Sequence, residues 1–283
     1  MKKEQEFLNR AVGLLVIEVV NSNPNGDPDQ ESDPRYREDD RGEISPVSFK
    51  RKVRDLIDDK NGPVWSHVGA NLDPKRFQIM ETPQRDRKEI MEKPIEDLLE
   101  KYWDARVFGT TFLEKKNVGG TAIKTGVVQF GLGLSVAPIQ IIRMTNTNKS
   151  GVQEGKDRGM APLGYRVVQH GVYTMPFFVN PSAATKTGCS QEDIELLCNV
   201  IPYAYSNTSS YIRSDVRIRH AWFVEHKSAL GSVSDFMILD ALQPRLNEKL
   251  GKSAPSCWDN YIVPEALPTE LNKKIASIRD LIG

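Results

Sequence analysis

Cysteine is scarce in this sequence, and charge of neither sign is in excess. The 283 residues include only three cysteines, Cys189, Cys198 and Cys257, which are far apart and odd in number. Such a set argues against the disulfide framework of a small secreted protein and is typical of a reducing compartment, so we expect a cytoplasmic protein. Lysine plus arginine and aspartate plus glutamate number 38 each, which gives a formal net charge of zero. Affinity for nucleic acid must therefore come from local basic patches.

Long apolar runs are also absent. The best candidate, AVGLLVIEVV at residues 11–20, is interrupted by Glu18 and is too short to span a bilayer. Lys2 and Lys3 precede it, but no small-residue cleavage site follows, so it does not fit a signal peptide. We predict that residues 11–20 form a buried strand and that the protein has no membrane partner.

Motifs for catalysis and metal binding are missing as well. The four histidines show no ligand spacing, and neither GxSxG nor HExxH occurs. The stretch NSNPNGDPDQES at 21–32 approaches an EF-hand loop, but Ser32 stands where the bidentate glutamate should be. A turn that ends the first strand explains these Asn, Asp, Gly and Pro residues better than a calcium site does. We predict no catalytic residue, no metal site and no cofactor.

A basic helix follows a long acidic loop at residues 21–45. Ser45 is a candidate N-cap with Pro46 at the first helical position, and the next residues read VSFKRKVRDLIDDK. The apolar residues share one face, and Lys50, Arg51 and Arg54 come out on the opposite side. Two interpretations stay open: a solvated face balanced by the neighbouring aspartates, or a surface that contacts phosphates.

The remaining pattern predicts an α+β fold. We predict a helix at 94–109 inside an insertion at 61–120, strands at 126–144 and 165–180 forming one extended hairpin around a polar excursion, and a helix capped by Ser190 and Asp193. A strand at 214–226, a helix at 234–242 and a C-terminal helix at 269–282 follow. The order is the βαββαβ pattern of ferredoxin-like folds with large insertions.

Further basic groups lie where chain reversals expose them. Arg143 is at the base of the excursion, which carries Lys149, Lys156 and Arg158 and is flanked by Met144 and Met160. Tyr211, Arg213, Arg217 and Arg219 follow the second helix of the pattern. The first strand has no aromatic residue, so it cannot supply the stacking platform of an ordinary RNA-recognition sheet.

Taken in order, these segments resemble one family over about residues 11–230. NSNPNGDPD, SFKRKVRD, DARVFGTTF, VQFGLGLSVAPI and GYRVVQHGVY are similar to the backbone subunit of CRISPR Cascade complexes, the Cas7 family of the RAMP superfamily, in its subtype I-C form. The resemblance implies a single domain over 1–283: a modified RNA-recognition palm, a finger-like helical insertion at 61–120 and a hairpin thumb at 144–164. It implies that copies polymerise along a CRISPR RNA (crRNA) and leave its bases free to pair with target DNA. The RNA contacts then expected are Asn21, Asn23, Ser48, Lys50, Arg51, Arg54, Arg143, Met144, Lys149, Lys156, Arg158, Met160, Tyr211, Arg213, Arg217 and Arg219.

The resemblance also implies partners. These are crRNA, target DNA through the guide, copies of the same chain, the crRNA-processing subunit at the 5′ handle, the large and small Cascade subunits, and a nuclease-helicase recruited to the assembled complex. The acidic residues beyond Asp27 are expected to lie away from phosphate. Two alternatives stay open: a metal-dependent RNase of the type III kind that uses a loop aspartate, and a calcium-stabilised interaction protein.

Overall fold

A large antiparallel sheet forms the centre of the protein. The computed structural model describes residues 8–82, 94–111, 123–148, 161–247, 249 and 254–283. The strands run in the order β14 (Ile275–Asp280), β11 (Val216–His226), β1 (Ala11–Ser22), β10 (Ala161–Val179), β8 (Gly133–Pro138) and β4 (Arg41–Ile44). In addition, β7 (Val128–Phe130) and β9 (Ile141–Asn148) pair with β10, which completes an eight-stranded sheet. The expected mixed α and β class is confirmed.

The chain path through this sheet follows the strand-helix-strand-strand-helix-strand order expected from the sequence. It runs β1, α1 (Pro46–Asp58), β8, β10, α7 (Gln191–Val200) and β11. Strand β10 lies between β1 and β8, and β1 lies between β10 and β11. Each helical crossover therefore joins two parallel strands that are separated by a third strand.

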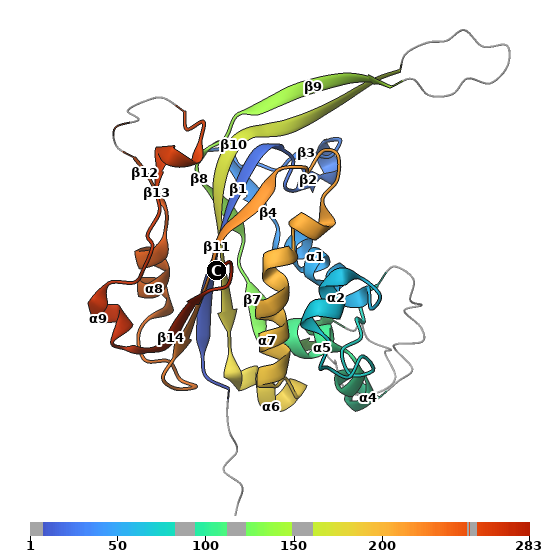
Figure 1. The fold of residues 1–283 in the computed structure, drawn as a ribbon, viewed down its shortest axis with the longest axis vertical. Coiled ribbons are helices and arrows are strands. Elements are labelled where there is room, and N and C mark those ends of the chain that lie inside the picture. The colour runs from blue at the N-terminus through green and yellow to red at the C-terminus, as the bar shows by residue number, and fades with distance from the viewer. Residues whose placement is uncertain (1–7, 83–93, 112–122, 149–160, 248, 250–253) are drawn as a thin grey trace, which may run out of the picture.

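Both faces of the sheet are covered, as Figure 1 shows. Leu15 and Ile17 of β1 belong to the core beneath α1 and α7, together with Phe49. Val12 and Leu14 point the other way and pack in a second core with α8 (Asp235–Leu242). A strand covered on both sides is apolar throughout rather than alternating, so the prediction of a buried strand at 11–20 is confirmed.

The Asn-rich loop after β1 organises the start of α1. Ser45 caps the helix by accepting a hydrogen bond from the Ser48 N–H (3.2 Å), and Pro46 is at the first position, as predicted. The buried Asn25 side chain in turn accepts a hydrogen bond from the Ser45 N–H through its Oδ1 (2.7 Å). This is turn and cap chemistry, which supports the turn interpretation of the loop.

The prediction of one long loop at 21–45 is wrong. The segment contains β2 (Gly26–Asp27), η1 (Pro28–Gln30), β3 (Asp33–Pro34) and the edge strand β4. Strand β4 alternates between half-buried Arg41 and Glu43 and buried Gly42 and Ile44, and it pairs with β8. The alternation covers only four residues, which is too short a pattern to reveal the strand in the sequence.

The insertion contains α2 (Pro63–Val68), α4 (Ile95–Lys101) and α5 (Trp103–Phe108), followed by β5 (Gly109–Thr111) and β6 (Ile123–Thr125). The helix predicted at 94–109 is interrupted at Tyr102, which has extended backbone angles and bridges to Gln78. Its predicted end is confirmed, because α5 stops before Gly109. That residue has φ +85°, a conformation that favours glycine.

The predicted C-terminal helix at 269–282 is wrong beyond its first turn. Only α9 (Thr269–Asn272) is helical, and β14 then pairs with β11. His226 pairs with Ile275 and Val224 with Ile278, because a bulge adds one residue to β14. The bulge places Ile275 and Ile278 on one face at a spacing of three residues, which imitates a helical pattern.

Short elements complete the described chain. They are η2 (Pro181–Ala183), α6 (Ala184–Thr187), η3 (Ile201–Tyr203), η4 (Ser206–Thr208), β12 (Arg245–Leu246), η6 (Trp258–Asn260) and β13 (Tyr261–Ile262). Strands β12 and β13 pair with each other. The helix predicted at 234–242 is confirmed as α8, and the strand predicted at 214–226 as β11.

A buried ion pair attaches the insertion to α7. Asp193 completes the predicted capping box with Ser190, and both of its carboxylate oxygens also accept hydrogen bonds from Arg106. The Arg106 guanidinium donates further to the backbone carbonyls of Leu99 (2.8 Å) and Arg76 (3.1 Å). Trp103 Nε1 donates to the Asp193 carbonyl (3.0 Å). The charged groups are therefore fully bonded although both are buried.

Replacing Arg106 by Met should lower the free energy of unfolding by about 3–5 kcal/mol, because Asp193 would remain buried without its cation. Arg279→Met is the matched control, since Arg279 pairs with Glu195 at the surface and should cost about 1 kcal/mol or less. Urea denaturation of both variants measures the difference. Equal effects would show that the buried pair does not hold the insertion.

Candidate nucleic-acid interface

The hairpin of β9 and β10 extends beyond the sheet, as Figure 1 shows. Its register runs from Val168 opposite Ile141 to Ala161 opposite Asn148, which confirms a hairpin around the excursion. The predicted single strand at 126–144 is divided among β7, β8 and β9, and both hairpin strands continue four residues into the segment expected to be a loop. Met144 is exposed on β9 and pairs with Tyr165. The excursion residues Lys149, Lys156, Arg158 and Met160 lie outside the described residues. The described part of the hairpin base is therefore where the site can be built.

Two arginines face each other at this base. Arg143 of β9 is directly opposite Arg166 of β10. Like charges in that position repel each other, but the ion pair between Arg166 and Asp33 neutralises one of them. No carboxylate of the described residues pairs with Arg143, whose guanidinium lies over Gly164. The arrangement leaves one exposed positive charge on the hairpin base.

An aromatic pair lies at the same end of the hairpin. Tyr165 of β10 and Tyr211 have ring centroids 5.4 Å apart in an edge-to-face arrangement, and their hydroxyl oxygens are 3.4 Å apart. Tyr211 is 62% exposed, which is unusual for so large a side chain. An exposed ring offers a surface on which a nucleotide base can stack.

The residues that follow β1 form another side of the site. The Asn23 N–H donates to the Ile212 carbonyl (2.7 Å), and Arg213 Nε donates to the Asn23 carbonyl (2.9 Å). Asn21, two residues earlier, is exposed and has φ +42°. A cavity of about 210 Å³ is lined by Asn23, Glu31, Ser32, Asp33, Arg143, Gly164, Tyr165, Arg166 and Ile212. The structure thus places Arg143 and Asn23 on one cavity and Arg213 against Asn23, while Tyr211 contacts Tyr165, which lines the same cavity.

Sequence reasoning missed two residues at this site, Tyr165 and Arg166, and also the buried Lys52 of α1. Lys52 points inward from α1, where its Nζ donates to Thr208 Oγ1 (3.0 Å) and lies 5.1 Å from the centre of the Tyr205 ring. Burial, assisted by the nearby positive charge of Arg213, lowers the pKa of Lys52 to about 8. The KRK triplet shows three adjacent cations, but only the packing of α1 against the segment at 206–208 distinguishes the last one, Lys52.

The basic face expected on α1 is not a free surface. Arg54 is only 5% exposed and pairs with Asp104 and Glu81 (both 3.0 Å), so the expectation that it is solvent-exposed is wrong. Arg51 pairs with Asp55, and its guanidinium also donates to the Glu81 carbonyl (2.7 Å). The insertion covers this side of the helix, which a helical pattern alone cannot reveal.

Lys50 and Ser48 also make contacts within and around α1. Lys50 Nζ lies 5.0 Å from the centre of the Phe108 ring, and burial, followed by repulsion from Arg54, lowers the pKa of Lys50. The Ser48 N–H is used in the helix cap. None of the α1 residues that the sequence pattern proposed lines the cavity at the hairpin base.

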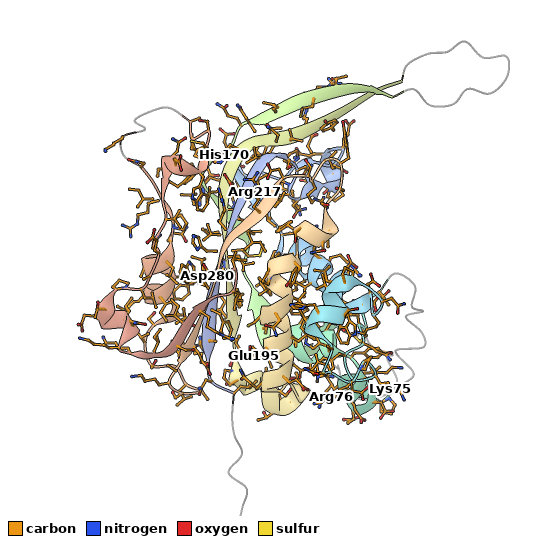
Figure 2. All side chains as sticks on the ribbon, in the orientation of Figure 1. Lys75, Arg76, His170, Glu195, Arg217 and Asp280 are labelled. Atoms are coloured by element: carbon orange, nitrogen blue, oxygen red, sulfur yellow. The ribbon has the colours of Figure 1, made fainter. Side chains whose placement is uncertain are left out.

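Arg217 and Arg219 lie on the other face of the sheet. Arg219 Nε donates to the buried Glu18 (2.8 Å) and its guanidinium stacks 4.6 Å over Trp258, while Arg217 pairs with Asp215 (2.6 Å). His170 is 3.2 Å from the same Glu18 carboxylate, and Figure 2 labels it near Arg217. The expectation that one groove unites these arginines with the α1 residues is therefore wrong.

Two aspartates of the acidic loop hold its turns, and Asp33 pairs with Arg166. Asp27 accepts a hydrogen bond from the Asp29 N–H, and Asp39 accepts one from the Arg41 N–H, both at 3.2 Å. Within the described ranges, no group of three or more histidine, cysteine, aspartate or glutamate side chains could hold a metal ion. The same part of the chain has no helix that is both long and apolar enough to cross a bilayer.

Comparison with known families decides the identity of this fold. Residues 9–264 match the family model described as CRISPR-associated protein Cas7. The chain belongs to the Cas7 family. A curated Cas7 protein of Haloferax volcanii is 25% identical over 227 residues, which cover 72% of this chain and 66% of that protein, just under two thirds of its length.

Solved structures similar to this Cas7 chain come from CRISPR complexes. A chain of a "CRISPR RNA-guided surveillance complex, pre-nicking" aligns with 15% identity and a TM-score of 0.49, covering 76% of this chain and 78% of that one. A chain of a type III-B Cmr-beta complex bound to cognate target RNA aligns with 10% identity and a TM-score of 0.44, covering 77% and 61%. The family assignment rests on the match over 9–264.

The lowered pKa of Lys52 predicts a pH effect on stability. Between about pH 8 and about pH 10 the folded protein has lost this proton while the unfolded chain retains it, so stability should rise by about 2 kcal/mol relative to Lys52→Met. Urea denaturation of both proteins across this pH range measures the difference. Parallel curves for the two proteins would show that Lys52 is not desolvated.

Proposed function

We propose that this protein is a non-catalytic backbone subunit of a type I-C CRISPR Cascade complex, which binds crRNA through the base of its hairpin. Membership of the Cas7 family supports the assignment to CRISPR systems. The observation that carries the RNA-binding proposal is the exposed charge of Arg143, which no described carboxylate neutralises although Asp33 neutralises the arginine opposite. Phosphate is the ligand that such a site would bind.

The parts of the fold take the following roles in this proposal. The sheet with α1 and α7 is the RNA-recognition palm, residues 61–120 are the finger-like insertion, and residues 144–164 are the thumb. Figure 1 supports this assignment, since the hairpin projects from one end of the sheet while the insertion lies beside α1 and α7. The whole chain acts as one domain.

The contacts are of two kinds. Arg143 binds backbone phosphate, which carries no sequence information, so a guide of any sequence is accepted. Tyr211, supported by Tyr165, stacks on a base. Asn21, Asn23, Arg213 and Met144 complete this surface. Lys149, Lys156, Arg158 and Met160, which lie outside the described residues, are further proposed RNA contacts. Arg54 has a positioning role instead, and Lys50, Arg51, Ser48, Arg217 and Arg219 lie outside the primary surface.

Assembly follows from the same proposal. Copies bind head to tail along one crRNA, and a contact of this kind that does not close generates an open helix. The resulting filament presents the guide to target DNA in the cytoplasm and joins the 5′-handle, large and small Cascade subunits before a nuclease-helicase is recruited. A net charge of zero suits this arrangement, because only one of the surfaces of each copy meets RNA.

Replacing Arg143 by Ala should weaken binding to all single-stranded RNA sequences alike and should reduce the slope of log affinity against log salt by about 0.7, the value for one phosphate contact. Tyr211→Ala should cost about 1–3 kcal/mol for a stacked base. Lys75→Ala is the control, since Figure 2 shows Lys75 at the end of the molecule away from the hairpin. If Arg143→Ala behaves like this control in fluorescence anisotropy titrations, the hairpin base is not the binding surface.

Coexpression with a CRISPR array tests the assembly. We expect a particle that contains RNA of guide length, protected from nuclease at even intervals, and no magnesium-dependent cutting of a complementary RNA. Regular cuts that require magnesium and disappear when Asp33 is replaced by Ala would instead establish the RNase alternative. Protein that purifies without RNA and is stabilised by calcium would overturn both.

A further inference from the structure

The ion pair between Arg166 of β10 and Asp33 of β3 lies at the protein surface. Its side chains are 53% and 18% exposed, and both residues line the cavity of about 210 Å³ at the hairpin base. By contrast, the Arg106–Asp193 pair is almost completely buried. A surface ion pair contributes little to stability, because water solvates both groups when the pair opens. Asp33 can therefore release Arg166 at little cost to the fold.

Arg143 shares one face of the hairpin with Arg166. The two residues are directly opposite each other in the β9–β10 register, and directly opposite side chains project from the same face of a sheet. The Arg143 guanidinium leans over Gly164, where an added Cβ atom would lie 3.2 Å from its Nη2. Gly164 is two positions before Arg166 on β10, so it belongs to the same face. Both guanidinium groups therefore border one cavity.

The lining of this cavity carries two arginines and two carboxylates. Asp33 pairs with Arg166, whereas neither Glu31 nor Arg143 forms an ion pair with a described residue. A phosphate group presents several acceptor oxygens, so it can accept hydrogen bonds from two guanidinium groups at once. A backbone phosphate that contacts Arg143 therefore gains a second cation if it replaces Asp33 on Arg166.

We propose that Asp33 is an intramolecular competitor of the RNA backbone: it holds Arg166 in the free protein and releases it to the phosphate that Arg143 binds. The inference rests on the function proposed above, and it adds Arg166 as a second phosphate ligand and Asp33 as the group that regulates it. An anion displaces Asp33 only if it binds Arg166 better than a carboxylate does, and a phosphate already held by Arg143 meets this condition. Each copy therefore binds RNA less tightly than its two arginines alone would allow.

Removing both members of the pair tests whether Arg166 contacts RNA. The double variant Arg166→Ala/Asp33→Asn leaves the net charge unchanged, because it removes one charge of each sign. In fluorescence anisotropy we expect it to bind single-stranded RNA about 10-fold more weakly than the unaltered protein, since a charged hydrogen bond is lost. The matched control is Arg37→Ala/Glu43→Gln, which removes a surface pair of similar exposure (47% and 21%) that does not line the cavity. Unchanged affinity in both double variants would overturn the inference.

Removing the carboxylate alone tests the competition. Asp33→Asn keeps the shape of the side chain and should tighten RNA binding roughly 2- to 5-fold, the range expected when a surface ion pair no longer has to open. Glu31→Gln is the control, because it removes the same charge from the same cavity but releases no arginine. Circular dichroism and thermal unfolding confirm that each variant is folded.

The outcomes separate this inference from the proposed function. Equal effects of Asp33→Asn and Glu31→Gln would show that only the general charge of the cavity matters, which overturns the competition. RNA binding that is weakened by Arg143→Ala but not by the Arg166→Ala/Asp33→Asn double variant overturns the inference and leaves the proposed function standing. Failure of the unaltered protein to bind RNA would overturn the proposed function itself.

Discussion

Two buried carboxylates determine how the inserted segment is attached to the sheet. Asp193 at the start of α7 forms an ion pair with Arg106, and Asp104 of α5 forms one with Arg54 of α1. Asp104 also accepts hydrogen bonds from the backbone N–H groups of Met80 (2.7 Å) and Glu81 (3.1 Å). These ion pairs therefore attach the insertion to both α1 and α7, the helices that cover one face of the sheet. The charged groups involved stabilise the fold.

Cations in such buried ion pairs support the fold and differ from cations that remain accessible to a ligand. A stretch such as SFKRKVRD is easily assigned to nucleic acid as a whole, yet its residues point toward the insertion, toward the segment at 206–208 or into a local ion pair. By contrast, Arg143 on β9 has no carboxylate partner among the described residues, because its cross-strand neighbour Arg166 pairs with the nearby Asp33. The density of positive charge along a sequence is thus a poor guide to where an anion can bind.

Local signals predicted the elements well, and non-local packing limited the prediction of the site. The buried strand β1, the Ser45 cap of α1, the Ser190 capping box and the β9–β10 hairpin all follow from residues within a few positions of one another. The bulge in β14 and the break at Tyr102 depend on pairing with distant strands or loops, so no local pattern shows them. Burial of Arg54 and Lys52 likewise requires knowing what packs against each side of α1.

Strand β10 connects the hairpin to the interior without a break. Its 19 residues run from the outer end of the described hairpin to the middle of the sheet, where β1 pairs with one edge and β7 and β8 with the other. Because β10 is hydrogen-bonded to strands on both edges over its inner half, the hairpin has no flexible connection to the sheet. The projecting part and the sheet therefore move as one unit, so the direction of the hairpin determines the orientation of the whole sheet.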